Sequence, residues 1–144
     1  MIEDEVRDSP TAWVSAHIRR YLESDGRDGH DYNGFPTLLL TTRGRKSGTP
    51  RRTALIYGRV DDDRYVVVAS NGAAVNNPQW YLNLTADPEV RVQVRADRFT
   101  ARARLADPDE RPRLWELMAG IFPTYQTYAA KAPRQIPVVV LERS

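Results

Sequence analysis

Apolar and polar positions along the chain alternate in some segments and recur at helical spacing in others. In residues 90–95 the alternation is strict, which is typical of a strand with one buried face and one face open to solvent or a ligand. Residues 136–141 form a β-branched run that is typical of a central strand. The same reasoning predicts about six strands: 37–42, 52–60, 64–70, 90–95, 99–105 and 136–141.

Capping signals and helical spacing predict three to four helices between these strands. Ser9-Pro10 supplies an N-cap residue followed by a proline at the first helical position, and Asn77-Pro78 repeats this signal. Asp107, with Glu110 three residues later, has the spacing of a capping box. The expected helices cover 10–23, 79–84 and 108–121, with a short one after Pro123, and 25–34 has the composition of a loop.

These elements predict an α+β domain, mainly β, built as a small antiparallel barrel with helices on its flanks. With 144 residues, of which 41% are hydrophobic, the chain is long enough for one domain with a proper core. We expect a single domain over 1–144, with an N-terminal helix and loop in 1–35 and the barrel in 36–144.

Several kinds of chemistry are disfavoured by what the sequence lacks. There is no cysteine, and His17 and His30 do not stand at the spacing of metal ligands, so neither a thiolate nor a metal site is expected. The net charge is only +2 and no nucleic-acid module is recognised, so nucleic acid is not an expected partner. Without a signal peptide or an apolar run of about 20 residues, a cytoplasmic protein is expected.

The most distinctive segment is a basic turn, residues 41–52, which carries five positive charges, two glycines and no acid between two apolar runs. Charged hairpin tips are often simply solvated. A merely soluble turn would mix charges of both signs, however, and the glycines let the backbone approach a ligand closely. Cationic side chains and free backbone N–H groups at one place suit a phosphate or a polycarboxylate.

Arginine, aromatic residues and glycine turns are the remaining candidates for function. Together they favour a large, flat, anionic molecule that itself carries the reaction. Tyr125 and Tyr128 lie three residues apart on a polar helix and are expected to face a pocket, although aromatic residues at this spacing also pack in cores.

Several motifs, in order and in register, resemble the deazaflavin-dependent nitroreductase family, in particular its F420H2-dependent quinone reductase type. The basic turn carries the first of them, Thr-Thr-Arg-Gly-Arg-Lys-Ser-Gly-Thr-Pro-Arg, at 41–51. The match continues through Ala-Ser-Asn-Gly at 69–72, Asn-Pro-Gln-Trp-Tyr-Leu-Asn-Leu at 77–84, Pro-Glu-Val at 88–90, Phe-Pro-Thr-Tyr-Gln-Thr-Tyr at 122–128 and Ile-Pro-Val-Val-Val at 136–140.

The resemblance implies a split β-barrel related to FMN-binding barrels, coenzyme F420 as cofactor, and reduction of a quinone such as menaquinone and, in some relatives, of a nitroaromatic compound. It places the cofactor's phosphodiester and oligoglutamate tail at the basic turn and its ring beside residues 69–71. The implied cofactor-binding residues are Arg45, Lys46, Ser47, Gly48, Pro50, Arg51, Ala69, Ser70, Asn71, Asn77 and Trp80.

The resemblance also implies an acceptor side. Tyr125, Tyr128 or Ser70 would orient the acceptor oxygen while hydride passes from C5 of the cofactor. Some relatives carry tyrosine where this chain has Ile56 and Phe122, and lysine where it has Asn71, so the acceptor pocket is more apolar and a quinone is favoured over a nitro compound.

Two alternatives stay open at this stage: an FMN- or FAD-using reductase on a similar barrel, and a non-catalytic F420-binding protein. A menaquinone acceptor would further imply peripheral contact with the inner face of the membrane. The first helix, with Trp13, Val14, Ile18 and Leu22, could supply that contact or could pack on the barrel.

Overall fold

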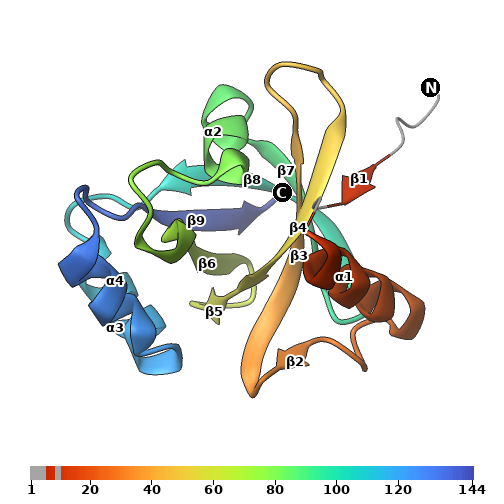
Figure 1. Cartoon of the computed structure of the whole chain (residues 1–144), viewed down its shortest axis with the longest axis horizontal. Helices are drawn as coiled ribbons and strands as arrows, with labels where there is room; N and C mark the ends of the chain where they lie inside the picture. Colours follow the sequence, from red (N-terminus) through yellow and green to blue (C-terminus); the bar gives the residue numbers. More distant parts are fainter. Residues whose placement is uncertain (1–5, 9–10) are drawn as a thin grey trace.

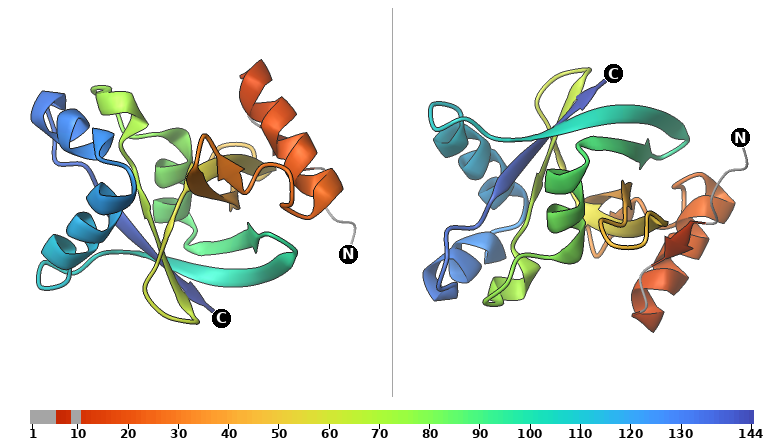
Figure 2. Two further views of the ribbon diagram at one scale, coloured as in Figure 1. Left: turned by 90° about the horizontal axis from the view of Figure 1, so that it is seen from below. Right: turned by 90° about the horizontal axis from the view of Figure 1, so that it is seen from above.

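A computed structural model describes residues 6–8 and 11–144, so the predicted helix start at Ser9-Pro10 lies outside the described residues. One sheet runs through the molecule, with α3 and α4 on one flank and α1 on the other (Figures 1 and 2). The strands are β1 (Arg7–Asp8), β2 (Asp31–Tyr32), β3 (Phe35–Arg43), β4 (Pro50–Ile56), β5 (Gly58–Arg59), β6 (Arg64–Val68), β7 (Glu89–Val94), β8 (Asp97–Leu105) and β9 (Val138–Arg143). The helices are α1 (Ala12–Ser24), the short 3-10 helix η1 (Asn71–Ala73), α2 (Gln79–Ala86), α3 (Arg111–Ile121) and α4 (Thr124–Lys131).

The basic turn is the tip of the long antiparallel hairpin β3–β4, as predicted. The hairpin pairs Thr37 with Ile56 at one end and Arg43 with Pro50 at the other. Figure 1 shows its tip extending beyond the sheet beside α2. The turn between these strands therefore stands clear of the core while both of its ends are held by the ladder.

The prediction of a barrel is confirmed only in part, because the sheet is not closed. Its strand order is β1-β4-β3-β7-β8-β9-β6-β5, with β2 paired to β3 off this path. The predicted strand over 52–60 is in fact two strands, β4 and β5, separated by Tyr57 alone. Since β4 lies near one end of the strand order and β5 forms the other end, the sheet must curl until its two ends approach each other.

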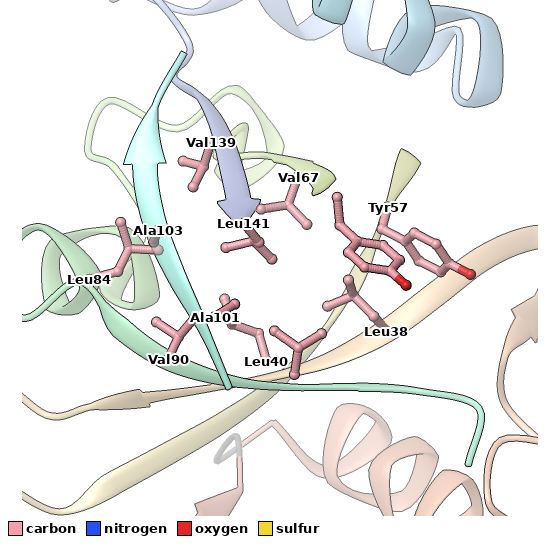
Figure 3. Close-up of a cluster of buried hydrophobic side chains, with 12 residues drawn as sticks. Leu38, Leu40, Tyr57, Val67, Leu84, Val90, Ala101, Ala103, Val139 and Leu141 are labelled. Atoms are coloured by element: carbon pink, nitrogen blue, oxygen red, sulfur yellow. The ribbon is translucent and has the colours of Figure 1, made fainter. Parts of the chain in front are cut away.

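The curled sheet encloses one core on its inner face. Leu38 and Leu40 of β3 point into this core with Val90, Val139 and Leu141, and all are almost completely buried. Their side chains converge between the strands in Figure 3. Removal of such a side chain from water contributes roughly 1.5–3 kcal/mol to stability, so this cluster fixes the hairpin that carries the basic turn.

Helix α1 packs on the outer face of the hairpin. Its Ile18 and Tyr21 are buried against Leu39, with Val14 and Leu22 partly buried around them. This accounts for the apolar stripe of the first helix by packing and leaves Trp13, 61% exposed, outside it. In the described part of the chain no helix is long and apolar enough to cross a bilayer.

Two of the predicted helix caps were wrong. Helix α2 begins at Gln79, as expected, but Pro78 is its N-cap residue, so Asn77 does not cap it. Helix α3 begins at Arg111 after a turn over 107–110, although the Glu110 carboxylate does accept a hydrogen bond of 3.0 Å from the Asp107 N–H. Pro123 is the N-cap residue of α4, in agreement with the prediction that a short helix begins there.

Candidate cofactor site

The backbone of the basic turn is closed by its two glycines. The Gly44 N–H donates to the Thr49 carbonyl at 2.9 Å, and the Gly48 N–H donates to the Gly44 carbonyl at 2.7 Å. Gly48 has a φ of +74°, and a Cβ added to Gly44 would lie 2.9 Å from both Ser47 Oγ and the Thr49 carbonyl oxygen. Both positions therefore require glycine, one for its φ and one for the close approach.

Within this closed turn, several hydrogen-bond donors are left for a ligand. The N–H groups of Lys46 and Ser47 meet no acceptor among the described residues. Ser47 Oγ accepts from the Thr49 N–H at 3.1 Å, so its own proton is free to be donated. Consecutive free N–H groups at a turn form a concave site for an anion.

Asn83 of α2 ties this turn to the rest of the molecule. It is 4% exposed, and its Oδ1 accepts from the Arg45 N–H at 3.2 Å and from Arg45 Nη1 at 2.9 Å. Its Nδ2 donates to Thr42 Oγ1 at 3.2 Å. A neutral amide thus holds the Arg45 guanidinium in place without cancelling its charge.

The five cations of the basic turn fall into two sets. Arg43 pairs with Asp87 at 3.3 Å and Arg52 with Asp8 at 2.6 Å. The other three, Arg45, Lys46 and Arg51, are exposed and form no ion pair with any carboxylate in the described part of the chain. We call these three residues the free cations; they leave a net positive charge at the turn.

The free cations line a cavity of about 570 Å³ between the hairpin tip, the N-terminal segment and α2. Of the predicted cofactor residues, the cavity is lined by Arg45, Lys46, Ser47, Arg51, Asn71 and Trp80. It is also lined by Arg7, Asp8, Thr11, Gly44, Arg52, Thr53, Gln79 and Asn83. Gly48, Pro50, Ala69, Ser70 and Asn77 do not line it. Asp8 carries the one carboxylate among the described residues that line the cavity, and it is bound by Arg52.

Ala69, Ser70 and Asn77 are gathered at a different point, around Arg134. The Arg134 guanidinium donates to the carbonyl oxygens of Ala69 and Ser70 and to Asn77 Oδ1, the last at 2.6 Å. The segment they belong to runs into η1, whose Asn71 lines the cavity. Three residues predicted to lie near the cofactor therefore share one partner.

Ile56, Phe122, Tyr125 and Tyr128, four of the residues predicted on the acceptor side, also lie together. They belong to or pack against a buried cluster formed by α3, α4, β6 and β9. Tyr125 is 5% exposed and packs at 4.9 Å, between ring centroids, against Phe122. Tyr128 and Ile56 are partly buried around the same cluster. None of the four lines the 570 Å³ cavity, but α4, which carries both tyrosines, packs against η1.

Burial raises the pKa of the Tyr125 phenol well above its usual value of 10. Every fully buried side-chain N or O atom in the described part of the chain has a hydrogen-bond partner. The Tyr125 hydroxyl has no partner among the described residues, so its oxygen is not fully buried and retains access to solvent. Tyr125 is therefore a neutral hydrogen-bond donor at neutral pH.

Neither histidine takes part in this site. His17 Nε2 is 2.7 Å from the Gly29 carbonyl oxygen. His30 lies between Asp31 Oδ1 at 2.6 Å and the Tyr57 hydroxyl at 2.8 Å. Both side chains are buried, both ring nitrogens of His30 and the Nε2 of His17 have partners, and neither residue lines the cavity.

The donor set of the cavity fits an elongated anionic ligand with an aromatic part. The free cations and the N–H groups of Lys46 and Ser47 suit phosphate or carboxylate oxygens. Trp80, which lines the cavity together with Asn71, offers an aromatic face. These residues bind charge and shape, and no histidine or cysteine is among the described residues that line the cavity.

Comparison with known proteins decides between the ligands that such a site could take. A model of the family "F420H(2)-dependent quinone reductase" matches residues 13–143. The chain belongs to this family. An F420H(2)-dependent quinone reductase of Mycobacterium tuberculosis is 40% identical over 131 residues, which cover 88% of this chain and 87% of that protein.

Two solved structures are similar to this chain, and the first of them is named as an F420-dependent reductase. The F420-H2 dependent reductase FDR-A is 36% identical with a TM-score of 0.68, over 74% of this chain and 94% of that one. A structure described as a domain-swapped dimer is 36% identical with a TM-score of 0.72, over 93% of this chain and all (100%) of that one. As a member of the F420H(2)-dependent quinone reductase family, the protein is an oxidoreductase with reduced coenzyme F420 as its cofactor.

Two residues of this family member were missed by sequence reasoning. Asn83 carried a weak signal, since it is a polar residue one turn after Gln79 and Trp80 on the helix that borders the cavity. Arg134 carried none, because an arginine after a helix is ordinarily a solvated residue. Its role depends on contacts with residues 57 to 65 positions away in the sequence.

Proposed function

We propose that this protein binds reduced F420 with the phosphodiester and oligoglutamate tail at the basic turn and reduces a quinone of the menaquinone type. The observation that carries the proposal is the coincidence, in one cavity, of the three free cations with the unbonded N–H groups of Lys46 and Ser47. The negative charge of a polyanionic tail complements the net positive charge of this cavity.

In this proposal the cofactor is held by two groups of residues. Arg45, Lys46, Ser47 and Arg51 bind the tail, and Gly48 and Pro50 give the turn its shape. Residues 69–71, with Asn77 and Trp80, lie beside the ring. When bound, reduced F420 supplies the hydride, so the protein's task is to orient two molecules and to keep water from their contact.

On the acceptor side, Tyr125 and Tyr128 are proposed to donate hydrogen bonds to the quinone oxygen, with Ser70 as a third donor. The raised pKa of Tyr125 supports this role, because the phenol keeps its proton at neutral pH. Ile56 and Phe122 add apolar surface around them. A neutral, largely apolar quinone fits such surroundings better than a polar nitro group does.

A titration of the purified protein with F420 and, separately, with FMN tests the cofactor assignment, with tryptophan fluorescence as the signal. We expect saturable binding of F420 and much weaker binding of FMN, since FMN lacks the oligoglutamate tail. Tighter binding of FMN would favour the flavin-using alternative and would contradict the proposal.

Turnover with a soluble menaquinone analogue then tests the reaction. We expect F420-dependent reduction of the quinone, and a loss of turnover on the order of 10²-fold when Tyr125 and Tyr128 are both replaced by phenylalanine, with F420 affinity unchanged. F420 binding without turnover would identify a non-catalytic binding protein. Wild-type rates in the double variant would assign the two phenols to packing alone.

A further inference from the structure

The guanidinium of Arg134, between α4 and β9, is fully engaged by one short segment, residues 69–77. Its Nε donates to the Ala74 carbonyl at 3.1 Å, its Nη1 to Ala69 and to Asn77 Oδ1, and its Nη2 to Ala69 and to Ser70. All five N–H groups are therefore used on four acceptors. Among the described residues no carboxylate pairs with this arginine.

These contacts determine which way the peptides at the end of β6 face. In a trans peptide the C=O and the following N–H point in opposite directions, and the described residues include no cis peptide. Because the Ala69 and Ser70 carbonyls point at Arg134, the N–H groups of Ser70 and Asn71 point away from it. Neither N–H meets an acceptor in the described part of the chain.

Of the two residues that carry these free N–H groups, Asn71 lines the cavity and Ser70 directly precedes it in the chain. The segment is otherwise weakly held: η1 has only two backbone hydrogen bonds of its own, Ala73 N–H to Ser70 at 2.9 Å and Ala74 N–H to Asn71 at 3.1 Å. Asn71 and Ala73 both have positive φ, at 48° and 66°, a conformation that costs about 1–3 kcal/mol unless the surroundings enforce it.

We propose that Arg134 is a positioning residue that fixes residues 69–74 so that the Ser70 and Asn71 N–H groups are presented to the oxygen atoms of the bound cofactor ring. The identity of the ligand in this inference rests on the proposed function, whereas the role of Arg134 in fixing residues 69–74 does not. Arg134 itself has no donor left for a ligand, so it acts only through the turn it holds.

Arg134 also follows α4 by three residues, and α4 packs against η1. One side chain thus joins the helix of the acceptor-side tyrosines to the segment beside the cofactor. A change in the position of either element alters the same set of hydrogen bonds.

Hydrogen exchange in the protein without F420 tests the structural part. Arg134→Lys keeps the positive charge but cannot reach all four acceptors from a single nitrogen. We expect exchange at the Ala73 and Ala74 amides to become at least about tenfold faster, with amides of β8 and β9 unchanged. Unchanged exchange at Ala73 and Ala74 would overturn the proposal. Asn77→Ala, which removes one acceptor, gives a milder second variant.

F420 titration and steady-state kinetics test the functional part. In Arg134→Lys we expect the Kd and the KM for reduced F420 to rise about tenfold with little change in kcat. The site is no longer preformed in this variant, so part of the binding energy is spent on ordering the turn. Arg64→Lys, at the opposite end of β6 and bound to Asp61, is the matched control and should leave both constants unchanged. Wild-type affinity in Arg134→Lys would overturn the proposal. Failure of the wild-type protein to bind F420 would overturn the proposed function instead, and the hydrogen-exchange result alone would then test whether Arg134 fixes residues 69–74.

Discussion

Arginine serves two different purposes in two regions of this molecule. Beside the cavity, Arg45 and Arg51 stand with Lys46 at an exposed turn without a carboxylate partner in the described chain. On β8, Arg104 is surrounded by acids: its Nη1 lies 2.6 Å from Glu110 Oε2 and its Nε 3.2 Å from Glu142 Oε1. Both regions are rich in arginine, but only one has its charge balanced.

The difference shows how to separate structural from functional charge in this fold. The Arg104 network joins α3 to β8 and β9, and it holds the pKa of Glu110 at about 2. The free cations are held instead by a neutral amide and by the turn itself, so their charge is left for a ligand. The number of arginines does not distinguish the two regions. The presence or absence of carboxylate partners does.

The largest effect is expected where charge is balanced. Arg104→Gln should lower the free energy of unfolding by about 2 kcal/mol, because it leaves the partly buried Glu110 without its partner. F420 affinity should not change. Denaturant unfolding measures the first and titration the second. Arg102→Gln, on the same strand but exposed and without an ion pair among the described residues, should change stability by less than about 0.5 kcal/mol; equal losses in both variants would show that the network adds nothing.

Acid should weaken the same network. The pKa of Glu110 in the folded protein, about 2, is below its usual 4.5, so its contribution to stability is complete above pH 4.5 and is lost as the pH falls toward 2. The stability gap between the wild type and Arg104→Gln should therefore narrow over this range. Unfolding curves at several pH values measure it, and a constant gap would contradict the assigned cause of the shift.

Charge reversal at the free cations should have the opposite pattern. Lys46→Glu is expected to weaken F420 binding about tenfold or more, while thermal stability stays nearly unchanged because the Lys46 side chain is exposed and forms no hydrogen bond or ion pair with the described residues. Lys131, the other lysine of the chain, provides the control variant Lys131→Glu, which should bind F420 as the wild type does. Equal weakening in the two variants would reduce the effect to net charge.

A smaller effect is expected when a free cation is converted into a paired one. Asn83→Asp keeps the acceptor oxygens for Arg45 but adds a negative charge, so Arg45 would come to resemble Arg104. We expect F420 affinity to fall about threefold, through cancellation of one partly screened charge. If affinity is unchanged, Arg45 contributes shape and not charge.

Much of the fold could be predicted because its strands have strong local signals. Alternation in 90–95 and the β-branched run near the C-terminus correspond to β7 and β9. The two-residue strands β1 and β2 are too short for any periodicity, and the break at Tyr57 is imposed by the curvature of the sheet. Asn77 shows a further limit, because its partner is Arg134, which lies 57 positions away, and not the helix that follows it.

The candidate site was partly predictable for the same reason. The basic turn is continuous in sequence, so its five cations could be found from charge and glycine alone. Which cations are free depends on Asp8 and Asp87, which come from distant segments. The Arg134 contacts follow from tertiary structure only, and the burial of Tyr125 follows from the packing of α3 and α4 on the sheet.

The salt dependence of F420 affinity tests most directly the central claim that unpaired charge at the basic turn holds the cofactor's tail. Titrations at about 0.05 M and about 0.5 M salt should show a clear loss of affinity for the wild-type protein, because exposed charges are screened over this range. Lys46→Gln should show a distinctly smaller loss, and Lys131→Gln the same loss as the wild type. Equal salt dependence in all three proteins would contradict the claim.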